Sequence, residues 1–182
     1  MRSNPEQTNT VIVGAGQAGL AMSAHLTTHN ISHIILEKHR LVERWRTARW
    51  DSLVANGPAW HDRFPVQEFA DISGDDFATR EEIVSYFEHF ADAVKAPVRC
   101  GVEVSAVTRF NDGGFLVETN SGQIMAENVV AATGPFQTPV MPPLVPQDDA
   151  IHQMHSSEYR NPQQLRDGAV LVIGAGSSGV QI

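Results

Sequence analysis

The 182-residue chain contains a single cysteine, Cys100, and is poor in basic residues. One cysteine cannot form an intramolecular disulfide, which suits a reducing cytoplasm, and it removes any dithiol redox pair from this stretch. Lys and Arg number 13 against 21 Asp and Glu, which gives a net charge of −8. This charge argues against a surface for nucleic acid or for an anionic membrane. We therefore expect a cytoplasmic protein that binds neither nucleic acid nor membrane.

Long apolar runs are also missing from the sequence. No stretch approaches the roughly 20 apolar residues that a membrane span requires. Strand-like residues follow the polar N-terminus at once, so we expect no signal peptide. We find neither a Ser-His-Asp constellation nor paired catalytic carboxylates. With 42% hydrophobic and 19% charged residues, the composition is that of a soluble globular protein long enough for one domain and part of another.

A βαβ unit of the expected size opens the chain. Residues 10–13 (TVIV) predict a buried strand, residues 16–29 a helix, and residues 33–36 (HIIL) a second strand. The loop between the first strand and the helix reads Gly14, Ala15, Gly16, Gln17, Ala18 and Gly19. This Gly-x-Gly-x-x-Gly pattern, placed between a strand and a helix, predicts a dinucleotide site.

Each glycine of that loop has a physical role in binding a dinucleotide. Gly14 permits a tight turn, Gly16 lets the backbone approach a pyrophosphate, and Gly19 lets helix and strand pack closely. The helix N-terminus then offers free N–H groups to the phosphates. Glu37, at the end of the second strand, can accept hydrogen bonds from ribose hydroxyls. Because its carboxylate would repel a 2′-phosphate, this first site should not hold NADP.

The middle of the chain changes texture twice. Residues 79–82 form a capping-box pattern that predicts a helix with Ile83, Phe87, Phe90, Ala91 and Val94 on its apolar face. After Pro97, strand-like segments separated by glycine turns predict a small antiparallel meander returning to a buried strand at residues 128–132. Residues 135–150 are rich in proline and predict a linker. An apolar run at residues 169–173 then predicts the start of a second βα unit.

A second glycine loop follows that apolar run. It contains Gly174, Gly176, Ser177, Ser178 and Gly179. An ordinary NAD dehydrogenase needs one such loop, so two loops suggest two dinucleotides. We expect FAD in the first and a nicotinamide cofactor in the second, with hydride passing from one ring to the other.

Further segments carry a resemblance to a known family. These are Val129-Val-Ala-Ala-Thr133-Gly134, Trp45-Arg46, the segment LVANGPAWHDRFP with Asn56, and His155-Ser-Ser-Glu-Tyr159. Together with both loops, they make the whole chain resemble flavin-dependent monooxygenases with two dinucleotide-binding domains. That group includes flavin-containing monooxygenases, plant YUCCA-type enzymes and Baeyer–Villiger relatives. The sequence departs from the family pattern at Val42-Glu43, where many members have Gly-Gly, and at Asp149 and Ile151 of the fingerprint that ends in Tyr159.

The resemblance implies an α/β fold and a division of the chain. It implies a Rossmann-like FAD-binding domain with a parallel sheet and an inserted antiparallel meander at residues 1–146. A linker at 147–168 and the start of a second Rossmann-like, NAD(P)-binding domain at 169–182 would follow. We expect the chain to be the N-terminal portion of a longer enzyme. FAD and NADP are the implied cofactors, and NAD is not excluded because the residue that reads the 2′-phosphate would lie later.

The implied reaction oxygenates a small organic substrate. NADPH reduces the flavin, which takes up O2 to form a C4a-hydroperoxide and passes one oxygen on. Asn56 is the candidate catalytic residue; alternatively, it is a loop asparagine that favours a turn before Gly57. The predicted cofactor-binding residues are Gly14, Ala15, Gly16, Gln17, Ala18, Gly19, Glu37, Lys38, Trp45, Arg46, Val104, Thr133, Gly134, Gly174, Gly176, Ser177, Ser178 and Gly179. The type of oxygenation and the oligomeric state stay open.

Two other functions remain possible from the sequence. A thioredoxin-reductase-like enzyme shares the scaffold and would carry its cysteine pair beyond residue 182. A truncated FAD-binding module without turnover is the non-enzymatic alternative. His25, His29 and His33 lack a carboxylate or thiol to complete a ligand set, so we expect no metal site. We also expect Trp50 and Trp60 to pack in the core and Cys100 to be buried.

Overall fold

The computed structural model describes residues 5–64, 67–143 and 150–182. The chain forms two compact units. The first comprises Met1–Val42 and Phe87–Pro135, and the second comprises Glu43–Tyr86 and Phe136–Ile182. The predicted boundaries at residues 146 and 168 concern domains of a larger enzyme and stay predictions. Residues 144–149 of the proline-rich stretch, Asp149 among them, lie outside the described residues.

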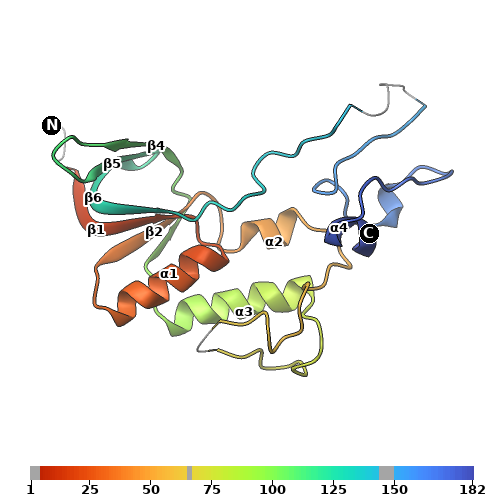
Figure 1. Ribbon diagram of the computed structural model, residues 1–182, viewed down its shortest axis with the longest axis horizontal. Helices are drawn as coiled ribbons and strands as arrows, with labels where there is room; N and C mark the ends of the chain where they lie inside the picture. Colours follow the sequence, from red (N-terminus) through yellow and green to blue (C-terminus); the bar gives the residue numbers. More distant parts are fainter. Residues whose placement is uncertain (1–4, 65–66, 144–149) are drawn as a thin grey trace. The chain divides into compact units, whose positions relative to one another are not determined.

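The first unit is built on a six-stranded mixed sheet with the order β3-β2-β1-β6-β5-β4 (Figure 1). Its strands are β1 Glu6–Val13, β2 His33–Glu37, β3 Val98–Cys100, β4 Val104–Arg109, β5 Phe115–Thr119 and β6 Gly122–Ala131. The strands β3, β2, β1 and β6 run parallel, whereas β4 and β5 continue from β6 as an antiparallel meander. This arrangement confirms the predicted α/β fold, a Rossmann-like parallel sheet with an inserted meander.

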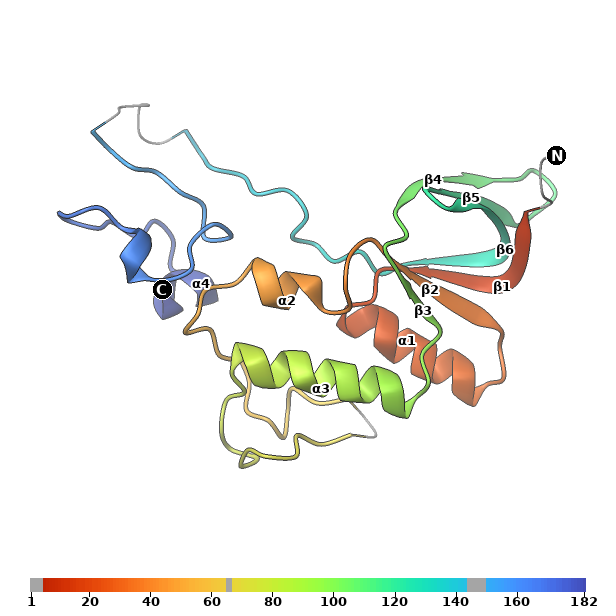
Figure 2. The same cartoon turned by 180° about the vertical axis from the view of Figure 1, so that it is seen from behind.

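Helix α1 (Gln17–Thr28) connects β1 to β2 and covers one face of the parallel strands, as Figure 2 shows from behind. Leu20 of α1 is fully buried, as are Ile12 and Ile35 of the sheet. Ser23, also fully buried, shares a hydrogen bond of 2.8 Å with His33 Nε2. The other ring nitrogen of His33, Nδ1, is hydrogen-bonded to Ile31 O at 2.8 Å, so both ring nitrogens have a partner.

The opposite face of the parallel strands packs against the meander. Val11, Ile34 and Leu36 form one cluster with Val117 and Ile124. Alternation along the strands explains this, because Val11 and Ile12 are neighbours in β1 and point to opposite faces. Because both faces of β1 are covered, its residues 11–13 form a continuous apolar run in the sequence.

Three expectations for the first unit need correction. The predicted first meander strand breaks at Gly101, whose φ of +74° lets the chain turn, and its first part is β3, parallel to β2. Cys100 lies on β3 at the sheet edge and is exposed rather than buried. Residues 128–132 are half-buried to exposed, because the packed part of β6 is its earlier half, which contacts the meander core through Ile124 and Ala126.

The second unit is less regular. Its helices are α2 Glu43–Thr47, the 3-10 turn η1 Pro162–Gln164 and α4 Ser177–Gln181; α3, Arg80–Ala93, continues from it into the first unit. The capping box at the start of α3 is confirmed: the Glu82 carboxylate accepts from Thr79 N–H at 2.8 Å, and Thr79 Oγ1 accepts from Glu82 N–H at 3.3 Å. Trp50, Leu53 and Tyr159 form the buried cluster of this unit.

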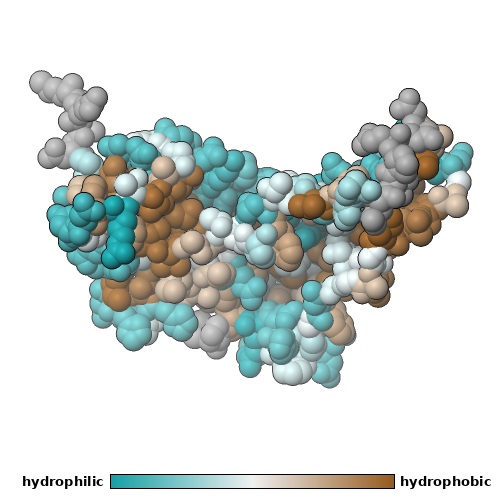
Figure 3. Space-filling model, turned by 45° about the horizontal axis from the view of Figure 1, so that its top comes forward, coloured by the Kyte–Doolittle hydropathy of each residue, from teal (hydrophilic) through white to brown (hydrophobic). Residues whose placement is uncertain are grey.

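Two expectations for the second unit are wrong. Residues 169–173 form no strand, since the described residues provide no neighbouring strand to pair with them. Their apolar side chains are exposed, Leu171 to 80%. Trp60 is 58% exposed, with its ring edge-on to that of His61, so it is not a core residue, unlike Trp50. Figure 3 shows apolar surface in brown among the polar surface on one face of the molecule.

Candidate functional site

The first glycine loop lies where β1, β2 and β6 end. Gly14 has a φ of +105°, and its N–H donates to Leu36 O at 2.8 Å. A Cβ at this position would lie 2.5 Å from Ala132 O and 3.3 Å from Thr133 Cα. The loop therefore approaches the end of β6 so closely that only glycine is accommodated without a shift.

The other two glycines of this loop differ in what surrounds them. A Cβ on Gly19 would collide with the carbonyl oxygen of Gly14, so the start of α1 packs directly on the turn. A Cβ on Gly16 would meet nothing within 4 Å. Gly16 is the N-cap of α1, and no side chain caps it. The loop thus presents an open backbone surface and uncapped N–H groups, as a pyrophosphate requires.

Glu37 is held against this loop by its own carboxylate. One oxygen accepts from Ala15 N–H at 2.9 Å, and the other accepts from His39 N–H at 3.0 Å. A carboxylate has about four lone-pair positions, so each oxygen can still accept from a ribose hydroxyl. The Glu37 carboxylate therefore holds the backbone of the first glycine loop in place, a role that the sequence pattern did not reveal.

The remaining predicted residues of the first site also lie at this edge of the sheet. Val102 N–H donates to Glu37 O at 2.9 Å, which brings the segment leading to Val104 beside Glu37. Lys38 makes an exposed ion pair of 2.7 Å with Glu103. Thr133 and Gly134, with a φ of +77° at Gly134, follow β6, whereas Gln17 and Ala18 are exposed in the first turn of α1. The first unit brings all these residues to one end of its sheet.

The second glycine loop repeats the backbone geometry of the first. Gly174 has a φ of +118°, Gly176 is an N-cap without a side-chain cap, and a Cβ on Gly179 would collide with Gly174 O. Val180 N–H donates to Gly176 O at 3.1 Å, as Leu20 N–H donates to Gly16 O at 3.0 Å. The two loops differ at their first glycine: within the described residues, a Cβ on Gly174 would meet nothing within 4 Å, whereas a Cβ on Gly14 would meet Ala132 O.

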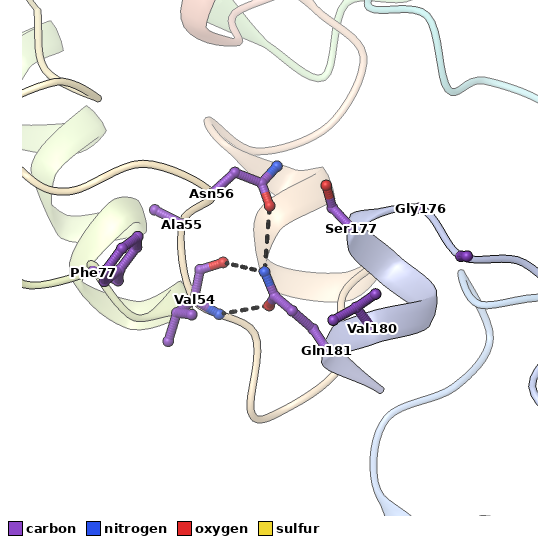
Figure 4. A pocket seen from close by; sticks show the side chains of 9 residues that line it. Val54, Ala55, Asn56, Phe77, Gly176, Ser177, Val180 and Gln181 are labelled. Carbon is purple, nitrogen blue, oxygen red and sulfur yellow. Dashed lines mark hydrogen bonds between the residues drawn. The ribbon is translucent and has the colours of Figure 1, made fainter.

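The second loop borders a shallow pocket of about 530 Å³ within the second unit (Figure 4). One wall is the segment Val54, Ala55 and Asn56 with Phe77, and the other is Ala175, Gly176, Ser177, Val180 and Gln181. The predicted catalytic residue and the predicted nicotinamide loop therefore meet at one pocket. Ser178 lies next to the lining residues in α4 and is half-buried.

Asn56 does not close its own turn. The N–H of Gly57 donates instead to Asp62 Oδ2 at 2.9 Å, and Asp62 Oδ1 binds His61 Nδ1 at 2.7 Å. Asn56 Oδ1 accepts from Gln181 Nε2 at 3.3 Å, across the pocket. The turn at Gly57 is therefore held by Asp62, and the catalytic role of Asn56 stays a prediction. Asp62 and Gln181 were not predicted from the sequence, because no short-range pattern links either residue to Asn56.

Trp45 and Arg46 belong to α2 in the second unit, whereas Glu37 and the first loop belong to the first unit. Trp45 packs against the Trp50 cluster, and the Arg49 guanidinium lies 5.5 Å from the centre of the Trp45 ring. Burial, and secondarily the charge of Arg44, lowers the pKa of Arg49 from its ordinary value. The side chain thus makes a cation–π contact from a partly desolvated position.

Val42 precedes this helix and adopts an unusual conformation. Its φ is +60°, and its side chain is buried. A β-branched residue is strained in this region, where glycine is unstrained. Many members of the family that the sequence resembles have Gly-Gly at this point. The backbone of this chain has a glycine-like conformation here although the side chain is valine.

Asp51 links three segments of the second unit. Its carboxylate accepts from Asn161 Nδ2 at 2.7 Å and from Arg80 Nη1 at 3.0 Å, and its N–H donates to Arg160 O at 2.7 Å. The hydrogen bond from Asn161, and then the contact with Arg80, lowers the pKa of Asp51. The turn with His155 and Tyr159 comes directly before Arg160 and Asn161, and Tyr159 is buried in the Trp50 cluster.

The histidines first considered as metal ligands do not form a cluster. His25 on α1 and His29 at its C-cap are exposed, and His33 uses both ring nitrogens in hydrogen bonds. In residues 5–64, 67–143 and 150–182 no group of three or more His, Cys, Asp and Glu could hold a metal ion. Over the same residues, every helix is too short or too polar to cross a membrane.

Comparison with known proteins gives a consistent set of relatives. The chain is 42% identical over 177 residues to an uncharacterized CzcO-like oxidoreductase of Geobacillus kaustophilus, covering 96% of this chain and 50% of the relative. It is 32% identical to the indole-3-pyruvate monooxygenase YUCCA1 of Oryza sativa subsp. japonica, covering 94% and 43%. A flavin monooxygenase from Stenotrophomonas maltophilia, solved as a double mutant, matches with a TM-score of 0.83 at 28% identity, covering 97% and 53%.

The chain spans about half the length of the curated relatives it matches. A family model described as pyridine nucleotide-disulphide oxidoreductase matches residues 11–182, which include both glycine loops, Glu37 and Asn56. Flavin monooxygenases are among the relatives, which agrees with the resemblance found in the sequence. The chain belongs to the pyridine nucleotide-disulphide oxidoreductase family.

Proposed function

We propose that this chain is the nucleotide-binding portion of an FAD-dependent, NAD(P)H-using monooxygenase that oxygenates a small organic substrate. The observation that carries the proposal is the pair of glycine loops with the same backbone geometry, the second of which shares a pocket with Asn56. A single dinucleotide would need one loop. The names of the relatives, which include flavin and indole-3-pyruvate monooxygenases, support the reaction class.

The first loop and Glu37 form the proposed FAD site. The open backbone at Gly16 and the N-terminus of the 12-residue helix α1 would bind the pyrophosphate. Glu37 would accept hydrogen bonds from the ribose and repel a 2′-phosphate, which selects FAD over NADP here. When bound, the flavin supplies hydride acceptance and oxygen activation, and the protein supplies orientation.

The second loop and Asn56 form the proposed nicotinamide site. Gly176 is as open as Gly16, so the backbone there can also approach a dinucleotide closely. Asn56 would donate from its amide to an oxygen of the nicotinamide. We keep NADP as the cofactor of this site on the family resemblance, with NAD as the alternative. We also place the reaction in the reducing cytoplasm, because the chain has one cysteine.

The first experiment is incubation of the purified 182-residue chain with FAD, followed by gel filtration and a visible spectrum of the protein peak. Retained flavin absorbance supports the first site as proposed. A colourless peak from a folded chain, verified by circular dichroism, contradicts it. Addition of NADPH to the flavin-loaded protein without oxygen then tests the second site, since loss of the flavin absorbance band reports hydride transfer.

A matched pair of variants separates the two sites. Gly16→Ala and Gly176→Ala add one methyl group to corresponding open positions, where no protein atom lies within 4 Å. We expect Gly16→Ala to weaken FAD and leave NADP⁺ unchanged, and Gly176→Ala to do the reverse. Equal effects of both variants on one cofactor would contradict the assignment of one dinucleotide to each loop.

A further inference from the structure

The side-chain amide of Gln181 binds both backbone polar groups of Val54. Val54 N–H donates to Gln181 Oε1 at 3.4 Å, and Gln181 Nε2 donates to Val54 O at 3.4 Å. Gln181 lies in the last turn of α4, directly after the second glycine loop, whereas Val54 lies two residues before Asn56. One side chain therefore connects the two walls of the pocket (Figure 4).

This pairing decides which end of the Gln181 amide faces which neighbour. A backbone N–H can only donate and a carbonyl oxygen can only accept, so Val54 N–H requires Oε1 and Val54 O requires Nε2. Nε2 carries a second hydrogen, and this one points to Asn56 Oδ1 at 3.3 Å. The orientation of Gln181 thus follows from the backbone of Val54.

The orientation of Asn56 follows in turn from Gln181. Because Gln181 offers a donor, Asn56 must offer its oxygen, and its Nδ2 group then points away from Gln181, as Figure 4 shows. Asn56 therefore presents two N–H donors rather than an acceptor. Such a group recognises a carbonyl or carboxamide oxygen and not an N–H group.

We infer that Gln181 is a positioning residue that sets the donor orientation of the Asn56 amide and couples it to the second glycine loop. This inference rests on the proposed function, in which Asn56 contacts the nicotinamide. The three hydrogen bonds, at 3.3–3.4 Å, are longer than the usual N–H···O distance, so their contribution to folding is small. The amide of Gln181 orients the Asn56 amide and does not contribute substantially to the free energy of unfolding.

The first test needs no ligand. In the ¹⁵N-labelled chain, the side-chain NH2 signals of Asn56 and Gln181 are identified by their loss in Asn56→Ala and Gln181→Leu. We expect the Gln181 protons to exchange more slowly with water than those of Gln163, which is exposed in the same unit. In Gln181→Glu the new carboxylate can only accept, so the Asn56 amide must turn and its NH2 signals must shift downfield. Gln163→Leu is the matched control and leaves the Asn56 signals in place.

Asn56 NH2 signals that stay unchanged in both Gln181→Glu and Gln181→Leu would overturn the inference. Circular dichroism verifies that each variant is folded. Should Gln181→Leu fail to fold, Gln181→Glu decides alone, since it keeps an acceptor for Val54 N–H.

The second test measures NADP⁺ affinity by calorimetry in a double-mutant cycle. We expect Asn56→Ala and Gln181→Leu each to weaken NADP⁺ by about threefold to tenfold, the worth of one hydrogen bond. In the double variant, Gln181→Leu should add nothing further, because Asn56 is already absent. A full additional loss in the double variant would overturn the inference, since Gln181 would then act independently of Asn56.

The two tests separate the inference from the proposed function. An Asn56→Ala variant that binds NADP⁺ normally contradicts the nicotinamide role of Asn56. The coupled NH2 signals would still support the positioning contact in that case. Conversely, an effect of Asn56→Ala on affinity without any coupling of the signals leaves the proposed function intact and overturns the role of Gln181.

Discussion

The carboxylate of Glu37 accepts a hydrogen bond of 2.9 Å from the backbone N–H of Ala15. The last residue of β2 thereby holds the loop that follows β1, and the same carboxylate faces the place proposed for a ribose. Recognition of the sugar and the shape of the phosphate loop thus depend on one side chain.

Replacement of Glu37 should therefore affect FAD binding strongly. Glu37→Gln leaves a single acceptor oxygen for two backbone N–H groups, so the loop loses one hydrogen bond and the ribose loses a charged acceptor. We expect FAD affinity to fall about tenfold or more, as for a hydrogen bond to a charged group. Flavin fluorescence titration measures this. Glu127→Gln, whose exposed oxygen can still accept from Asn9, is the control and should bind FAD as the unaltered chain does.

Gly14 and Gly16 should respond differently to alanine. Gly14→Ala places a methyl group 2.5 Å from Ala132 O at a φ of +105°, whereas Gly16→Ala meets open space. We expect Gly14→Ala to lower the free energy of unfolding by about 1–3 kcal/mol or more and Gly16→Ala to change it little. Urea unfolding compares the two. Similar destabilisation by both would mean that the loop is not packed on β6 as described.

At position 42, glycine should give a more stable protein than alanine, the reverse of the usual order. At a φ of +60°, alanine keeps the backbone strain that valine has, and glycine removes it. Both variants lose the buried valine side chain to a similar extent. We expect Val42→Gly to be more stable than Val42→Ala by about 1 kcal/mol, measured by urea unfolding. Val117, buried in strand β5, is the control position, where Val117→Ala should be more stable than Val117→Gly.

Phe90 should be important for the stability of the first unit. Its side chain is 1% exposed on α3, whereas Phe136 is 67% exposed. We expect Phe90→Ala to cost about 3–5 kcal/mol, because it removes buried area and leaves a cavity. Phe136→Ala should stay within about 0.5 kcal/mol of the parent. Thermal and urea unfolding check both, and equal effects would contradict the burial of Phe90.

Because of the contacts of Asp51, the free energy of unfolding should depend on pH in the acid range. Its pKa is lowered in the folded chain, first by the hydrogen bond from Asn161 and then by Arg80. A lowered pKa means that the stabilisation is complete above the unfolded value, about 3.9, and is lost as the pH falls through the folded value. The stability difference between the parent and Asp51→Asn should thus be constant near neutral pH and shrink below about pH 4. A difference that persists unchanged in acid would exclude the charged form of Asp51 as its source.

Much of the local structure was predictable from short patterns. The strands β1 and β2, helix α1 and the capping box of α3 depend on residues within a few positions of one another, so periodicity and cap chemistry identify them. The turn at Gly14 belongs to the same class, since its glycine pattern reports a backbone requirement. The buried Trp50 was also expected, whereas the exposure of Trp60 depends on what lies around it and was not.

The residues around the candidate site show the limit of such patterns. Asn56 was identified by its spacing and resemblance, but its partner Gln181 lies at the far end of the chain, and no local signal connects them. The same holds for Asp51 with Asn161 and for Glu37 with Ala15. Hydrogen bonds between distant segments depend on how the chain folds back and have no sequence period.

By itself, the sequence determined the two glycine loops, the βαβ unit and the family, because these rest on local backbone requirements and contiguous motifs. The tertiary structure alone decided that β6 pairs with β1, that Cys100 lies exposed at an edge, and that residues 169–173 form no strand. A strand exists only through hydrogen bonds to a neighbour, and a side chain is buried only when another segment covers it. Both conditions concern residues far away in the chain. For this reason the apolar run at 169–173 has the residue types of a buried strand and yet forms no strand.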